Sequence, residues 1–250
     1  MRILNRWLGL DAAVGLCAVM AAGSVALAFL GPDRSGELMS RPPLLALTGV
    51  LACALAASGV RAARRRRFDS ALLHVGCACV VSGWLIGRLA VLQATPDRPA
   101  TGAMAMVDGD QSDALYEGQY LTNAVGRVPF KVRLDRFFIE HYPSSPQDRE
   151  EGRMPPVKEY RSRVTITEPG QAPYVRNIRV NHPAYVRGYH IYQMSWGQSQ
   201  DMYGRPLIYT VLQFIRDPGL PVVYTGFAVL LAGLLLFVAR VLRSGSGGAP

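Results

Sequence analysis

Four long apolar blocks constrain what this chain can fold into more than any other feature of its sequence. They are Leu8 to Leu30, Leu44 to Ala63, Ala71 to Leu92 and Leu220 to Leu242. Each is about 20 residues long, the length that a helix needs to cross roughly 30 Å of hydrocarbon. The first block is longer than the apolar core of a secretion signal, and no clear A-x-A cleavage site follows it. The sequence therefore predicts four membrane spans, with the first retained as an anchor.

Basic residues beside the predicted spans set the expected orientation. These arginines are Arg2, Arg6, Arg61, Arg64, Arg65, Arg66, Arg67, Arg240 and Arg243. Since cytoplasmic loops carry an excess of Lys and Arg, both termini are expected in the cytoplasm and residues 93–219 outside it. Residues 95–219 carry 15 Lys and Arg against 14 Asp and Glu, whereas the whole chain has a net charge of +9. The excess positive charge is therefore a signal of topology, and no nucleic-acid partner is expected.

The outer segment has the pattern of strands, because short alternating or apolar runs are broken by turn residues. The expected strands are Phe130 to Tyr142, Tyr160 to Glu168, Tyr174 to Asn181, Tyr189 to Trp196 and Leu207 to Ile215. Ala94 to Gln111 is interpreted as a linker, and Ser144 to Pro156 as a mobile loop. The predicted fold class is an integral membrane protein with α-helical spans and an all-β extracytoplasmic domain, either a sandwich or a small open barrel. The expected parts are three spans in 1–94, the β domain in 95–219, the fourth span in 220–242 and a cytoplasmic tail in 243–250.

Residues that carry reactive chemistry are scarce in the outer segment. The cysteines Cys17, Cys53, Cys77 and Cys79 all lie in predicted spans, which excludes a disulfide framework or thiol chemistry in the outer domain. Cys77 and Cys79 form C-x-C but project about 200° apart on a helix, so no metal site is expected there. The segment also has no Ser/His/Asp motif, no HExxH and no carboxylate set of obvious spacing, so no enzyme is predicted.

The third predicted span contains two ionisable residues, His74 and Arg88, in the run LLHVGCACVVSGWLIGRL. Ionisable residues inside a membrane are candidates for function. A separation of 14 residues is about 21 Å of rise and about 40° of net rotation, so His74 and Arg88 share one face. The opposite face carries small residues that permit close packing on a neighbouring helix, namely Gly76, Cys79, Gly83 and Gly87.

Each of these polar residues has an ordinary interpretation beside a functional one. His74 is either a satisfied histidine at the membrane interface or, as a neutral imidazole, a ligand for iron. Arg88 lies near the outer end of its span, where the guanidinium can extend to the interface, and it is also a candidate for cofactor binding. Asp11, in the first turn of span one, is expected at the depth of His74, where it could accept the second ring N–H and orient the imidazole.

The stretch RVNHPAYVRGYHIYQMSWG, Arg179 to Gly197, combines a predicted turn with a predicted strand. Pro183 keeps His182 extended and cannot donate to a central ladder, so His182 lies in the turn, where it is a candidate ligand. The strand is expected to alternate, with Tyr189, Ile191, Gln193 and Ser195 on one face and His190, Tyr192, Met194 and Trp196 on the other. His190 and Met194 are about 13 Å apart on such a strand, so they cannot be the two axial ligands of one haem iron.

Several segments resemble, in this order, motifs of the ResB proteins, also called CcsB, of the system II pathway of cytochrome c biogenesis. They are LLHVG in span three, YEGQY at Tyr116, VPFKVRLDRFFIEHYP at Val128, VNHPAYVRGYHIYQMSWG at Val180 and RDPGLPVVYTGF at Arg216. The layout of three spans, a large outer domain and a last span is also similar. The segment from Val180 is the most specific of these matches.

The resemblance implies a multipass protein of the bacterial cytoplasmic (inner) membrane that handles haem with a partner of the ResC/CcsA type. Such a complex moves haem to the outer face and presents it to apocytochrome c. His74 occupies the position of the family's span-three histidine, which is regarded as an iron ligand during haem passage. The chain is shorter than better-known members, which have a larger outer domain, so the docking surface for apocytochrome c is expected to be reduced or absent. It has no CxxCH of its own, so it is not expected to be a c-type cytochrome. The alternative is a non-catalytic membrane scaffold or sensor whose β domain binds another ligand.

Overall fold

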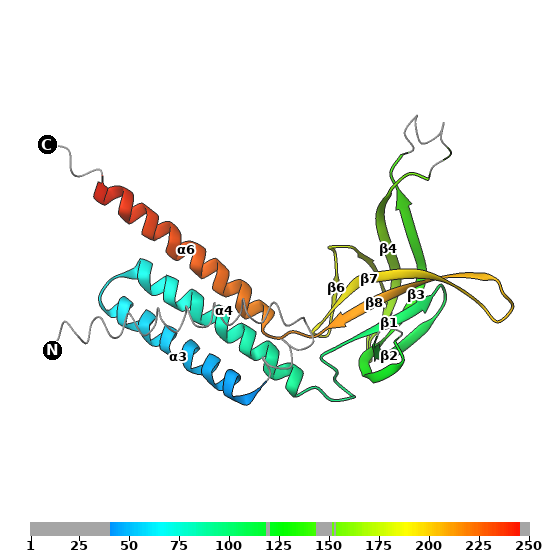
Figure 1. Cartoon of the computed structure of the whole chain (residues 1–250), viewed down its shortest axis with the longest axis horizontal. Helices are drawn as coiled ribbons and strands as arrows, with labels where there is room; N and C mark the ends of the chain where they lie inside the picture. The colour runs from blue at the N-terminus through cyan, green and yellow to red at the C-terminus, as the bar shows by residue number, and fades with distance from the viewer. Residues whose placement is uncertain (1–40, 119–120, 144–151, 153, 246–250) are drawn as a thin grey trace. The chain divides into compact units, whose positions relative to one another are not determined.

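The computed structural model describes residues 41–118, 121–143, 152 and 154–245. The chain divides into two compact units, which are a helical unit within Met1–Leu92 and Pro218–Pro250 and a β unit formed by Gln93–Asp217 (Figure 1). The first predicted span, which contains Asp11, lies outside the described residues. Most of the predicted loop from Ser144 to Pro156 lies outside them as well.

The helical unit contains three described helices, α3 (Pro42–Arg64), α4 (Phe68–Leu92) and α6 (Leu220–Gly245). All three are long and apolar enough to cross a membrane, judged by length and composition. Two prolines open α3, where their missing N–H groups cost no intrahelical hydrogen bond. The second, third and fourth predicted spans therefore coincide with helices.

Glycines bring α4 and α6 into close contact. A Cβ atom on Gly76 would lie 2.8 Å from the backbone nitrogen of Leu230, and one on Gly83 would lie 2.8 Å from that of Val223. On the facing helix, a Cβ on Gly226 would lie 2.8 Å from the backbone nitrogen of Val80. Small residues allow this approach because they place no side chain between the two backbones. The predicted packing role of Gly76 and Gly83 is confirmed.

The β unit is one open antiparallel sheet of eight strands in the order β5-β4-β3-β2-β1-β8-β7-β6. The strands are β1 (Thr101–Val107), β2 (Gln111–Glu117), β3 (Asn123–His141), β4 (Val157–Thr167), β5 (Tyr174–Arg179), β6 (Ala184–Val186), β7 (Tyr189–Gln200) and β8 (Pro206–Ile215). The all-β class is as predicted, and the five predicted strands correspond to β3, β4, β5, β7 and β8.

The interpretation of Ala94 to Gln111 as a linker is wrong. It contains β1, a central strand that pairs along its whole length with β8, from Thr101–Ile215 to Val107–Tyr209. Met104 and Met106 on this strand are each only 1% exposed. The run TGAMAMV has few of the β-branched and aromatic residues that mark strands, which explains the error, and the alternation of its methionines was the available signal.

The sheet curves around an apolar core on its inner face. Fully buried members of this core include Leu134, Ile166, Ile191, Leu212 and Phe214. A polar network lies among them, in which the Ser162 hydroxyl of β4 donates to Gln193 Oε1 of β7 at 2.6 Å and lies 3.1 Å from Thr210 Oγ1 of β8. Since β4 and β7 are not neighbours in the sheet, this network ties its two halves together.

Candidate functional site

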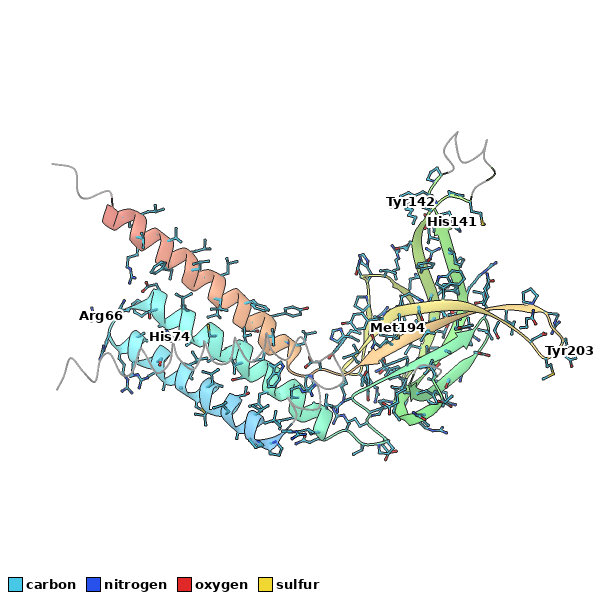
Figure 2. The ribbon with its side chains drawn as sticks, in the orientation of Figure 1. Arg66, His74, His141, Tyr142, Met194 and Tyr203 are labelled. Carbon is cyan, nitrogen blue, oxygen red and sulfur yellow. The ribbon has the colours of Figure 1, made fainter. Side chains whose placement is uncertain are left out.

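His74 lies on α4 with its ring held by the backbone of the preceding turn (Figure 2). Its Nδ1 is 2.7 Å from the carbonyl oxygen of Ser70. A carbonyl oxygen can only accept, so Nδ1 carries the proton, and in the neutral ring Nε2 then carries the lone pair. This is the tautomer that a metal-binding histidine adopts when a backbone carbonyl orients it.

One face of α4 repeats at the alternating spacing of four and three residues that keeps side chains aligned along a helix. We call it the His74 face, and it consists of Ser70, His74, Cys77, Val81, Trp84 and Arg88. Counting 100° per residue, this stripe points away from the α4 stripe that contacts α6, which contains Gly76 and Gly83. His74 and Arg88 are both half-buried and share the face, as their spacing predicts.

An ion pair that the sequence analysis missed fixes α4 against α6 one turn before His74. Asp69 Oδ2 lies 2.7 Å from Arg240 Nη1, and the Asp69 side chain is only 7% exposed. A buried carboxylate is costly unless it is paired, so this contact defines how the start of α4 meets the end of α6. The sequence did offer a signal for this pair, since Asp69 lies at the start of one apolar block and Arg240 lies near the end of another.

His182 lies in the β unit, in the predicted turn. Asn181 adopts a positive φ of 64°, and Arg179 and His182 form an isolated antiparallel bridge. The His182 side chain is exposed, with Nδ1 3.4 Å from the carbonyl oxygen of Val180. The turn is confirmed, and the ligand role of His182 stays a prediction.

Other residues of the same stretch hold the sheet together. The Tyr189 hydroxyl is buried and donates to the carbonyl oxygen of Pro99 at 2.8 Å. Burial raises the pKa of this hydroxyl. Arg187 Nε donates to Glu168 Oε2 at 2.6 Å, and the Tyr174 hydroxyl donates to Glu168 Oε1 at the same distance. The Tyr174 hydrogen bond, followed by that from Arg187, lowers the pKa of Glu168.

The predicted alternation of β7 holds only as far as Gln193. A register shift between Gln193 and Ser195, in the pairing with β8, inserts one residue at Met194. A bulge of this kind exchanges the faces of all later residues, so the prediction for Trp196 is wrong. Trp196 lies on the inner side, where its ring centroid is 5.8 Å from that of Tyr160 and 6.4 Å from that of Phe137.

These features define a class of protein. Its helical unit has helices long and apolar enough to span a membrane, and one of them carries a polar face. Its β unit is inserted in the sequence between two of these helices. A profile described as the ResB-like family matches residues 58–207. The match covers more than half of the chain, and the chain therefore belongs to the ResB-like family.

Two curated relatives match part of the same region. The chain is 29% identical over 133 residues to the cytochrome c biogenesis protein CcsB of Synechococcus sp. (strain JA-3-3Ab), a match that covers 52% of this chain and 23% of the relative. It is 33% identical over 130 residues to protein NrfI of Wolinella succinogenes, which covers 52% of this chain and 12% of the relative. The match therefore spans less than a quarter of the length of either relative.

Proposed function

We propose that this chain is a membrane subunit of cytochrome c maturation of the system II type, which holds and passes haem with a ResC/CcsA-type partner for attachment to apocytochrome c. The observation that carries the proposal is the hydrogen bond from His74 Nδ1 to the Ser70 carbonyl oxygen. It orients the imidazole and leaves the lone pair on Nε2, the atom that a haem iron takes as an axial ligand. The family membership and a relative named for cytochrome c biogenesis support the same function.

Haem is cargo in this proposal, and the His74 face is the path along α4. Arg88 lies about 21 Å further along the same face, which is farther than a haem iron lies from its own propionates. Arg88 would therefore meet a propionate at another point of the passage. The role of Asp11 as a second group that orients the His74 imidazole stays a prediction. The role of the exposed His182 of the β unit as a ligand stays a prediction as well.

The proposed topology has both termini in the cytoplasm and the β unit on the outer face of the bacterial inner membrane. The exposed arginines Arg65 to Arg67 form the turn between α3 and α4, and the exposed Arg64 ends α3. The Asp69–Arg240 pair brings the basic end of α6 beside the start of α4, close to this turn. The basic ends of the helical unit therefore lie together, which supports one cytoplasmic side. We assign no bond-making chemistry to the chain.

The first test is covalent haem staining of a c-type cytochrome in cells that lack their own maturation system and carry the partner, with and without this chain. Stained cytochrome is expected only when the chain is present. His74→Ala is expected to lower the staining while the protein stays in the membrane, and added imidazole should restore it. Ile86→Ala, at an exposed position of α4 that is not part of the His74 face, is the matched control and should stain normally.

Two outcomes would contradict the proposal. Equal staining with and without the chain would favour a scaffold or a sensor that binds another ligand. Loss of the His74→Ala protein from the membrane, with no rescue by imidazole, would indicate a structural role for this histidine. His74 Nδ1 lies 2.7 Å from the Ser70 carbonyl oxygen and 3.5 Å from the Ser70 hydroxyl. Ser70→Ala removes the hydroxyl and keeps the carbonyl oxygen that orients the ring. It should keep most of the activity.

A further inference from the structure

The solvent-facing side of β3, β4 and β5 places arginines directly opposite one another. Arg136 of β3 pairs in register with Arg163 of β4, and the next rung on the same face, two residues along, pairs Phe138 with Arg161. Side chains opposite each other on antiparallel strands have Cβ atoms about 5 Å apart, and like charges at this distance are destabilising. The free sheet therefore carries a local electrostatic cost here.

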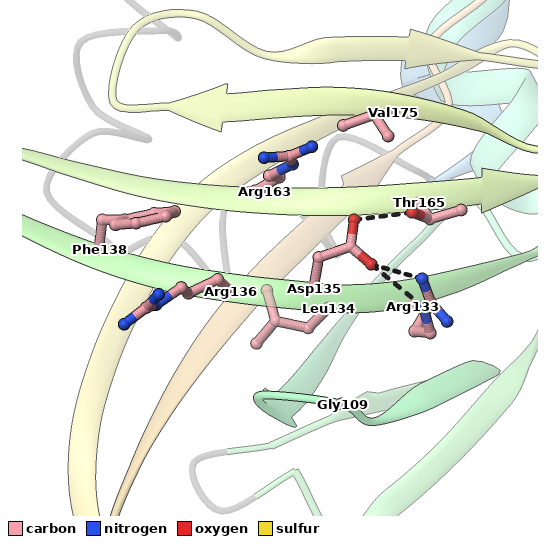
Figure 3. A pocket seen from close by; sticks show the side chains of 9 residues that line it. All are labelled: Gly109, Arg133, Leu134, Asp135, Arg136, Phe138, Arg163, Thr165 and Val175. Carbon is pink, nitrogen blue, oxygen red and sulfur yellow. Dashed lines mark hydrogen bonds and ion pairs between the residues drawn. The ribbon is translucent and has the colours of Figure 1, made fainter.

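Arg136, Arg163 and Phe138 line a hollow of about 600 Å³ on the sheet surface (Figure 3), and Arg161 packs on the Phe138 ring beside it. One carboxylate lies in it, that of Asp135, and its charge is already engaged. Asp135 Oδ1 accepts from Arg133 at 3.1 Å (Nε) and lies 2.9 Å from its Nη2, while Oδ2 accepts from the Thr165 hydroxyl at 2.7 Å. Asp135 thus neutralises Arg133 and leaves the charges of Arg136 and Arg163.

The other acids of β3 and β4 on this side of the sheet are also engaged, and Asp108 beside them accepts the Phe137 N–H at 2.8 Å. Glu140 pairs with Lys158 at 2.7 Å, and Glu159 pairs with Arg179 at 3.7 Å. Within the part of the chain that the structure describes, Arg136, Arg161 and Arg163 form no ion pair. Their guanidinium groups are the unbalanced charge of this surface.

An aromatic ring holds two of these guanidinium groups in place. The guanidinium carbon of Arg161 lies 4.7 Å from the centroid of Phe138, and that of Arg136 lies 5.5 Å from it. Cation–π attraction acts at these distances and limits the rotamers of both side chains. Arg161 Nε is buried and has no hydrogen-bond partner among the described residues. The guanidinium groups of Arg136 and Arg161 are therefore held in place on the Phe138 ring, and the Nε of Arg161 has no acceptor among the described residues.

We propose that this surface, which we call the arginine pocket (Arg136, Arg161 and Arg163 around Phe138), docks an acidic segment of a partner protein. The planar fork of a guanidinium matches a carboxylate in a bidentate manner, and a carboxylate between Arg136 and Arg163 would relieve the repulsion across the strands. The positive side chains extend over three strands, from Lys131 to Arg179, which suits several carboxylates along one segment better than one small anion. The positive charges line a hollow of the sheet surface, which a narrow protein segment can enter and a flat lipid surface cannot fill, so a protein segment is favoured.

The test uses the full chain in phosphatidylcholine nanodiscs and a fluorescein-labelled peptide of alternating Glu and Ala, followed by fluorescence anisotropy. The chain should bind this peptide and not the corresponding Gln/Ala peptide, and the affinity should fall as salt is raised. Arg136→Gln with Arg163→Gln should weaken binding about tenfold or more. The matched control, Arg127→Gln with Arg205→Gln, removes the same charge from arginines of the β unit whose side chains are each 73% exposed. It should change binding by about twofold or less.

A second measurement separates a binding role from a structural one. Since Arg136 and Arg163 repel each other, their replacement by Gln should raise the Tm of the unliganded chain by about 1–4 °C while it weakens peptide binding. A lower Tm would mean that the two arginines stabilise the free sheet and would overturn the proposal. Absence of peptide binding, an equal loss in the control variant, or arginine-dependent binding of phosphatidylserine vesicles in place of the peptide would overturn it as well.

Discussion

The packing inside the helical unit differs in kind from the packing inside the β unit. The helices α4 and α6 meet where side chains are missing, at glycines that let backbone approach backbone. The β unit is held by large buried side chains, including Phe214, Leu134 and Tyr189, that fill the space inside a curved sheet. The first unit should therefore fail when an atom is added, and the second when atoms are removed.

The largest effect is expected from emptying the β core. Phe214 is fully buried, and its ring centroid lies 6.5 Å from that of Phe130. Phe214→Ala should destabilise the β unit by about 3–5 kcal/mol, because it removes apolar contact and leaves a cavity. Thermal unfolding followed by the β-sheet signal in circular dichroism measures this. Ile208→Ala, on the same strand but 46% exposed, should have little effect, and an equal loss would contradict the comparison.

Adding volume between α4 and α6 should have the next largest effect. A Cβ on Gly226 would lie 2.8 Å from the Val80 backbone nitrogen and 2.9 Å from the Gly76 carbonyl oxygen, neither of which can move aside as a side chain can. Gly226→Val should cost about 1–3 kcal/mol through overpacking, measured as a lower unfolding temperature of the helical signal in detergent. Ala232→Val, at an exposed position of α6, is the control. Similar losses in both variants would argue against the close contact.

A smaller effect is expected at one hydrogen bond of the β unit. Tyr189→Phe keeps the ring but removes the donor to the Pro99 carbonyl oxygen. The expected cost is about 1–2 kcal/mol, since it includes leaving a carbonyl without its partner. Chemical denaturation of the wild type and the variant measures this cost. Tyr185→Phe, at a side chain that is 64% exposed, is the control and should leave the free energy of unfolding unchanged. If both variants unfolded with the same free energy as the wild type, the Tyr189 hydroxyl would contribute nothing to the stability of the β unit.

The smallest expected effect depends on pH. The hydrogen bonds from Tyr174 and Arg187 lower the pKa of Glu168 below its ordinary value of 4.5. Its ionised form therefore adds stability that is fully present above about pH 4.5 and is lost as the pH falls through the folded-state pKa. Glu168→Gln should lower the Tm at neutral pH, and its difference from the wild type should shrink below about pH 4.5. Glu117→Gln, at an exposed site, is the control and should leave the Tm at neutral pH unchanged.

Much of the architecture could be predicted from the sequence because it depends on long patterns. Apolar blocks predicted α3, α4 and α6, and alternating runs predicted five of the eight strands. The strand β1 was missed because its centre is built from Ala and Met, and because its partner strand β8 lies more than 100 residues later in the chain. The face of Trp196 was wrong because a one-residue bulge leaves no mark in the apolar pattern.

The candidate site shows the same division. The shared face of His74 and Arg88 followed from helical periodicity, since it depends on one helix alone. The pairing of Asp69 with Arg240 joins residues from two helices that are separated by the whole β unit, and no local pattern encodes it. The turn at His182 could be predicted from Pro183, whereas the hydrogen bonds of Arg187 and Tyr189 depend on loops that are distant in sequence.

The pairing of β1 with β8 has a mechanical consequence. The strand that follows α4 and the strand that precedes α6 begin and end at the same rung, Thr101 opposite Ile215, and the Arg216 N–H donates to the Ala100 carbonyl oxygen beside it at 2.8 Å. A force that separated α4 from α6 would pull on both strands from this one end. In that geometry the ladder opens like a zipper, one hydrogen bond at a time, instead of sharing the load across its length. A pull from α4 would therefore load the hydrogen bonds of Pro96, Pro99 and Ala100 first and the Thr101–Ile215 rung next, and the far strands of the β unit would remain undisturbed.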